Sequence, residues 1–101
     1  MILKKLNMNK QLLKESINRK EKSILFFNAT WCGACRDTYE IVDQIKESKP
    51  DYKFHDIDID NKDSNEIGEL FEVDFLPTIV VISETGYKTY SGKHQIKKLL
   101  K

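Results

Sequence analysis

Two cysteines separated by two residues are the part of this sequence best suited to chemistry. They lie in residues 30–36 (TWCGACR), and the chain has no other cysteine. A thiol pair at this spacing, across the first turn of a helix, comes within disulfide distance, so a reversible disulfide is geometrically reasonable. The alternative is half of a zinc site, but a second cysteine pair is missing, and His55 and His94 fall in a predicted strand and a predicted helix. No metal is therefore expected.

A helix beginning at this motif would give the two thiols different roles. Cys32 lies at its amino end, where unpaired backbone N–H groups and the helix dipole stabilise an anion, so Cys32 is the predicted nucleophile. Cys35 lies one turn further along and faces the core, which suits a resolving thiol that attacks a mixed disulfide from within. Gly33 is expected to relieve crowding in the tight loop between them.

The elements that must position this pair follow from hydrophobic periodicity. Residues 23–28 (SILFFN) form a continuous apolar run, typical of a strand buried on both faces of a sheet. Residues 33–48 carry apolar side chains at steps of three or four, which predicts a helix. Further strands are predicted at 2–6, 52–59, 78–82 and 87–90, and further helices at 9–19, around 67–71 and at 95–100.

This order of elements predicts the fold class. Strands that alternate with helices and then end in a hairpin and a last helix imply an α/β fold, with a central mixed sheet of about five strands flanked by about four helices. A chain of 101 residues suits one compact domain, so residues 1–101 are expected to form a single domain.

Charge and composition exclude several functional classes. Seventeen basic and sixteen acidic residues leave a formal net charge of +1, which gives no global attraction to nucleic acid or to an anionic membrane. The amino-terminal residues lack the continuous apolar stretch of a signal peptide, and no run approaches transmembrane length. We therefore expect a cytoplasmic monomer that binds neither nucleic acid nor a membrane.

The motif and its surroundings resemble the thioredoxin family over essentially the whole chain. The resemblance is carried by residues 27–35 (FNATWCGAC), by residues 76–78 (LPT) some forty positions later, and by Gly92. It implies a protein-disulfide reductase without a bound cofactor, which acts on oxidised protein substrates and is restored by an NADPH-dependent thioredoxin reductase. It also implies a cis bond before the proline. The substrate-binding residues would be Trp31, Gly33, Ala34, Leu76, Pro77 and Gly92.

Four positions depart from the family pattern. Phe26 stands where the family has a buried acid that relays a proton to the resolving thiol, and Asp56 replaces a nearby lysine, so we expect Asp56 to be buried beneath the cysteines as the base. Ala34 replaces a proline between the cysteines. Glu40 replaces a helix-kinking proline, which predicts a straighter helix over residues 33–48.

Two other functions remain as alternatives. A glutaredoxin would use glutathione, but the Gly-Gly segment usual after the proline strand is missing here. A thioredoxin-like domain could also serve only as a structural subunit of a larger assembly, in which case neither Cys32 nor Cys35 would be needed.

Overall fold

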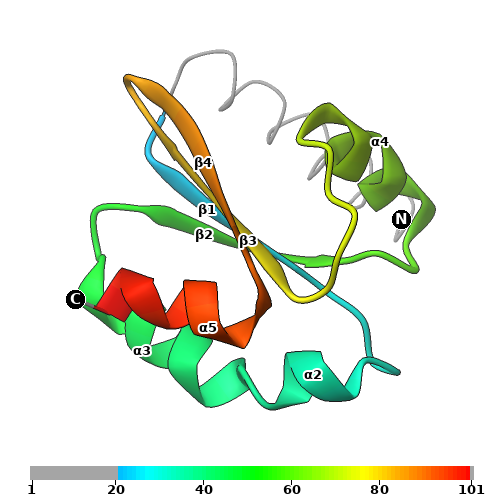
Figure 1. Ribbon diagram of the computed structural model, residues 1–101. Coiled ribbons are helices and arrows are strands. Elements are labelled where there is room, and N and C mark those ends of the chain that lie inside the picture. Colours follow the sequence, from blue (N-terminus) through cyan, green and yellow to red (C-terminus); the bar gives the residue numbers. More distant parts are fainter. Residues whose placement is uncertain (1–20, 101) are drawn as a thin grey trace, which may run out of the picture.

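The computed structural model describes residues 21–100, which form a mixed sheet covered by helices on both faces (Figure 1). The predicted strand at 2–6 and helix at 9–19 lie outside the described residues. The described strands run in the spatial order β2-β1-β3-β4. Their bounds are Ser23–Asn28 for β1, Lys53–Asp58 for β2, Thr78–Ser83 for β3 and Gly86–Ser91 for β4. Because β1 is parallel to β2 and antiparallel to β3, the predicted mixed sheet is confirmed.

The helices divide between the two faces of the sheet. They are α2 (Gly33–Arg36), α3 (Tyr39–Ser48), α4 (Lys62–Leu70) and α5 (Gly92–Lys97), and a short 3-10 turn, Lys98–Leu100, follows α5. Figure 1 shows α3 and α5 side by side on one face of the sheet, with α4 on the other. Within residues 21–100, no helix is long and apolar enough to cross a bilayer.

Strand β1 is central and buried along its whole length, as its apolar run predicts. Leu25 and Phe27 pack into the core on the α4 side, whereas Ile24 and Phe26 pack into the core on the α3 side. Fully burying a side chain of this size contributes about 1.5–3 kcal/mol. The carboxyl end of β1, where the cysteine motif begins, is therefore fixed by both halves of the core.

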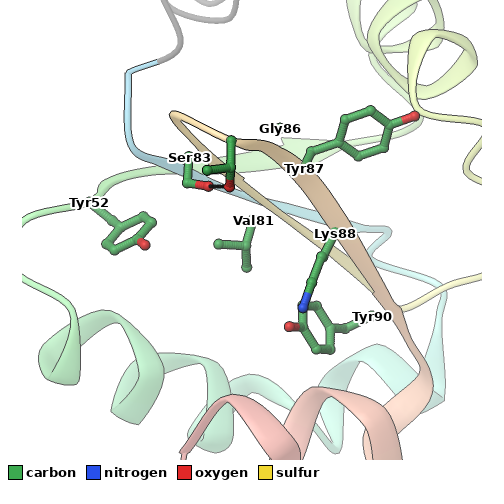
Figure 2. A pocket seen from close by; sticks show the side chains of 8 residues that line it. Tyr52, Val81, Ser83, Gly86, Tyr87, Lys88 and Tyr90 are labelled. Carbon is green, nitrogen blue, oxygen red and sulfur yellow. Dashed lines mark hydrogen bonds between the residues drawn. The ribbon is translucent and has the colours of Figure 1, made fainter.

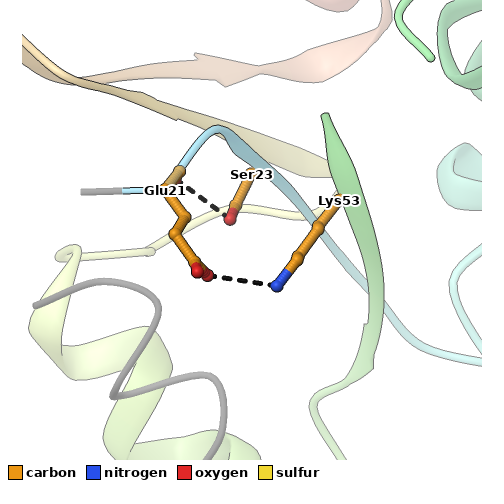
Figure 3. A network of polar contacts seen from close by, with 3 residues as sticks. All are labelled: Glu21, Ser23 and Lys53. Atoms are coloured by element: carbon orange, nitrogen blue, oxygen red, sulfur yellow. Dashed lines mark hydrogen bonds and ion pairs between the residues drawn. The ribbon is translucent and has the colours of Figure 1, made fainter. Parts of the chain in front are cut away.

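A network of polar contacts joins the amino ends of β1 and β2 (Figure 3). The Lys53 ammonium pairs with the Glu21 carboxylate at 3.1 Å, and the Ser23 hydroxyl donates to the Glu21 carbonyl at 3.2 Å. The lysine is well exposed, and such surface ion pairs contribute about 0–1 kcal/mol. These contacts therefore add little stability, and the alignment of the two strands comes from their paired backbone groups.

The hairpin end of the sheet carries an open hollow lined by aromatic side chains. Figure 2 shows Tyr52, Val81, Lys88 and Tyr90 around it, on the side that faces the red and green helices. Tyr87 points to the opposite side, where its ring meets Phe71 edge-on at 4.9 Å. The hairpin is therefore anchored to the α4 side of the core.

The single straight helix predicted over residues 33–48 is wrong. The chain turns between α2 and α3, and the Thr38 hydroxyl donates to the Cys35 carbonyl at 2.6 Å. The Thr38 amide donates to the same oxygen at 3.0 Å. This bond joins residues three apart, whereas an α-helical bond would join residues four apart. The interruption therefore arises from a local threonine contact, although the family's proline is absent.

Candidate functional site

The two cysteines are joined by a disulfide immediately after β1. The Cys32 amide donates to the Ala29 carbonyl at 3.1 Å, which turns the chain out of the strand and into α2. The two Cα atoms lie 5.2 Å apart, within the normal range for a disulfide. Cys32 is 7% exposed and Cys35 is 0% exposed. Both residues are therefore buried, and Cys32 is the one that keeps some contact with solvent.

The backbone is placed to stabilise a thiolate at Cys32 once the disulfide is reduced. This residue caps α2, and its sulfur accepts a hydrogen bond from the Cys35 amide at 3.1 Å. Because α2 has only four residues, little of this stabilisation comes from a long helix dipole. The N–H donor at the sulfur instead favours the thiolate directly, which is the form that attacks disulfides.

Gly33 and Ala34 lie at the surface between the cysteines. A Cβ atom built on Gly33 would meet no atom within 4 Å, so the expectation that this glycine relieves crowding is wrong. Both residues are exposed. The absence of a side chain at Gly33 and the single methyl group of Ala34 instead leave the surface beside the disulfide open.

Trp31 is 63% exposed, and its ring is held in place by a residue that the sequence alone did not identify. The indole N–H donates to both carboxylate oxygens of Asp60, at 3.1 and 3.2 Å. Asp60 follows β2, whose carboxyl end lies beside that of β1 because the two strands are parallel. The sequence could have indicated the Trp31–Asp60 contact, because both residues follow the carboxyl ends of strands predicted to be neighbours.

The proline loop lies against the cysteines. The Leu76–Pro77 peptide bond is cis, as the family resemblance implied. Leu76 packs on the cluster formed by Ala29, Cys32 and Cys35, while the Pro77 side chain is fully buried. The Gly92 amide donates to the Pro77 carbonyl at 2.8 Å, and the positive φ of 84° at Gly92 suits glycine. The structure thus brings Leu76 against the cysteines and Gly92 against Pro77.

Phe75 is a second residue of this loop that the sequence alone did not single out. Its side chain is 69% exposed although it is large and apolar. The Thr78 hydroxyl donates to the Phe75 carbonyl at 2.6 Å and lies 3.0 Å from the Ser91 hydroxyl, which fixes the backbone beneath it. The sequence could have indicated Phe75 as a residue of the docking loop, because it is an aromatic residue directly before Leu76.

Asp56 does not take the buried position expected of it. The residue is exposed on β2, and one of its carboxylate oxygens accepts a hydrogen bond from the Asn28 side-chain amide at 2.6 Å. The Asn28 amide also reaches the Phe26 carbonyl, at 3.2 Å. The burial predicted for Asp56 is therefore wrong, because its carboxylate projects at a strand edge next to Asn28.

Apolar side chains fill the region where the family places its buried acid. Phe26 is 2% exposed and meets the Tyr39 ring edge-on at 6.2 Å. The cysteine cluster itself is completed by two partly buried side chains, Ile59 and Leu76. The Cys35 side chain is therefore enclosed by apolar groups.

The arrangement also bears on metal binding. Within residues 21–100, no group of three or more His, Cys, Asp or Glu side chains is placed to hold a metal ion.

His55 is half-buried on β2, and burial, followed by the charge of Lys53, holds its pKa below the ordinary value. Its Nε2 atom is buried without a hydrogen-bond partner among the described residues.

Comparison with known proteins agrees with this geometry. The family model described as Thioredoxin matches residues 4–101. A thioredoxin from Mycoplasmoides gallisepticum is 28% identical over 92% of this chain and 95% of its own length. The mitochondrial thioredoxin-3 of Saccharomyces cerevisiae is 32% identical, over 64% of this chain and 50% of its own length.

Solved structures give the same result. The oxidised form of yeast mitochondrial thioredoxin 3 superposes with a TM-score of 0.70 at 26% identity, covering 81% of this chain and 76% of that one. Oxidised thioredoxin O2 from Arabidopsis thaliana gives 0.72 at 25% identity, covering 89% and 82%. With a disulfide at the end of the central strand and the cis-proline loop packed against it, this chain belongs to the thioredoxin family and is a thiol–disulfide oxidoreductase.

Proposed function

We propose that this oxidoreductase reduces protein disulfides with Cys32 as the nucleophile and Cys35 as the resolving thiol. The Cys32 thiolate attacks one sulfur of the substrate disulfide, forms a mixed disulfide and releases the other sulfur as a thiolate, which takes up a proton. Cys35 then loses its proton and attacks Cys32. The second substrate thiol leaves, and the two electrons have passed from the enzyme dithiol to the substrate.

The unequal burial of the two sulfurs carries this assignment. Cys32 keeps 7% exposure and its sulfur accepts a hydrogen bond from the Cys35 amide, whereas Cys35 is fully enclosed. An external disulfide reaches only the first of these sulfurs. The second can attack only a bond that already involves its neighbour, and the Cα separation of 5.2 Å allows that bond to form.

The substrate segment would dock across the open surface around the disulfide. We assign this docking surface to Trp31, Gly33, Ala34, Leu76, Pro77 and Gly92, and we add Phe75. Within residues 21–100, the main-chain N–H and C=O groups of Leu76 have no hydrogen-bond partner, so they are available to an extended peptide. Pro77 contributes through the shape of the loop, since its side chain is buried.

The proton of Cys35 needs an acceptor in the second step. The role of Asp56 as that base stays a prediction, but its exposure and its bond to Asn28 remove the structural reason for it. Bulk water that reaches the site while the mixed disulfide is still in place is the acceptor that we propose instead. A comparison of the Asp56→Asn variant with the wild type tests the two alternatives directly.

The remaining assignments concern the cellular setting. We propose that residues 1–101 act as one domain, since the family model matches residues 4–101. We also propose that this domain is a monomer. We also propose a cytoplasmic location, where a reducing environment keeps such a thiol pair active. The partner that restores the dithiol would be an NADPH-dependent thioredoxin reductase.

An insulin turnover assay tests the proposal. The protein is supplied with electrons either by NADPH and thioredoxin reductase or by NADPH, glutathione reductase and glutathione. We expect disulfide reduction with the first source and little with the second. Preferred turnover with glutathione would indicate a glutaredoxin, and no turnover with either source would indicate a structural subunit.

A further inference from the structure

A hollow of about 560 Å³ lies between α4 and the segment that leads into the Leu76–Pro77 loop. We call it the α4 hollow. Its apolar lining consists of Phe27, Ile59 and Val73, and the remaining lining residues are Ser64, Gly68, Glu69, Glu72 and Asp74. The floor is therefore apolar, and three carboxylates belong to the lining.

The α4 hollow borders the docking surface. Ile59 lines it and also packs against the cysteine cluster. Asp60, the next residue, holds the Trp31 indole, and Asp74 directly precedes the exposed Phe75. A polypeptide bound at the disulfide would thus extend over the hollow.

The end of α4 gives the hollow a defined shape. The Val73 amide donates to the Gly68 carbonyl at 2.9 Å, which closes the helix with Glu72 in the left-handed region at a φ of 54°. A Cβ atom on Gly68 would meet only the Phe27 ring, at 3.9 Å, so the absence of a side chain there keeps the wall open. The Glu72 side chain is exposed on this fixed turn.

Charge is strongly segregated toward this side of the molecule. Residues 58–76 contain seven acidic residues and one basic residue, whereas the whole chain has a net charge of +1. Within residues 21–100, the carboxylates of Glu69, Glu72 and Asp74 form no ion pair, and all three residues are exposed. The region is thus complementary to a positive group from outside.

We propose that the α4 hollow is a subsite for a lysine or arginine side chain of the protein whose disulfide is reduced. The methylene stem of such a side chain would pack on Ile59 and Val73, the partly exposed apolar residues of the lining, as long basic side chains do on apolar surface. Its charge would remain among the three carboxylates. The proposal rests on the proposed reductase function and adds a preference for disulfides with a basic flanking residue.

The test uses two synthetic peptides with the same intramolecular disulfide, one flanked by lysine and one by glutamine. Dithiothreitol regenerates the dithiol, so no reductase is needed. The variant combines Glu69→Gln, Glu72→Gln and Asp74→Asn. The matched control combines Glu40→Gln, Glu47→Gln and Glu84→Gln, which changes net charge equally at exposed positions on α3 and the hairpin.

We expect the wild type to reduce the lysine peptide with a kcat/KM about fivefold higher than that of the variant, and the difference to shrink at high salt. The glutamine peptide should be reduced equally by both proteins, and the control should behave as the wild type. Equal rates on the lysine peptide, or an equal loss in the control, would overturn the subsite. Failure of the wild type to reduce either peptide would instead overturn the reductase function itself.

Discussion

Replacing Thr38 with valine tests how the two helices around the cysteines are held in place. The Thr38 side chain is fully buried, and its hydroxyl donates to the Cys35 carbonyl at 2.6 Å. Valine keeps the shape and removes the donor. A net intramolecular hydrogen bond contributes about 0.5–1.5 kcal/mol, and the carbonyl keeps its bond from the Thr38 amide, so no acceptor is left unpaired.

We therefore expect Thr38→Val to lower the free energy of unfolding by about 1 kcal/mol, which lowers the Tm by about 4–8 °C in a domain of this size. Urea and thermal unfolding of the oxidised protein measure this. Thr89→Val is the matched control, because Thr89 is exposed on β4 and the same change there should stay within about 0.5 kcal/mol. A Thr38→Val protein as stable as the wild type would refute the reasoning.

Three further predictions follow from other contacts. The lowered pKa of His55 means that the unfolded chain binds the proton more tightly than the folded protein does. The stability that neutral His55 contributes is therefore fully present above about pH 6.5 and is lost as the pH falls below that value. Urea unfolding of His55→Gln should show a weaker pH dependence than the wild type between about pH 7 and 5. Gly33→Ala should leave the Tm unchanged or raised, because its Cβ meets open space, whereas Gly86→Ala should cost about 1–3 kcal/mol, because Gly86 has a φ of 131°. Asp56→Asn should change the rate of mixed-disulfide resolution, followed by stopped flow, by less than about twofold, since exposed groups make small contributions. A tenfold slowing would restore the carboxylate as the base.

Sequence patterns were sufficient for the strands within residues 21–100 and for the position of the site. The run at residues 23–28 matches β1 at both ends, because a central strand needs apolar side chains on both faces. The cysteine motif lies where β1 ends and α2 begins, as the change of periodicity predicts. The proline loop was located by family resemblance, since nothing in its composition indicates which residues it faces.

Features that depend on individual polar contacts could not be predicted in this way. The break after α2 arises from one hydroxyl, and the apolar periodicity of residues 33–48 continues across it. The exposure of Asp56 depends on strand position and on the amide of Asn28, which no local pattern of β2 contains. The α4 hollow combines residues from β1, α4 and two loops, so it exists only in the folded protein.

Trapping of the mixed disulfide tests the central assignment most directly. The Cys35→Ser and Cys32→Ser variants are incubated with an oxidised protein substrate, and the covalent adducts are resolved on a non-reducing gel and mapped by mass spectrometry. The unequal burial of the two sulfurs predicts a stable adduct at Cys32 in the first variant and none in the second. An adduct at Cys35 in the Cys32→Ser variant, with none in the other, would contradict it.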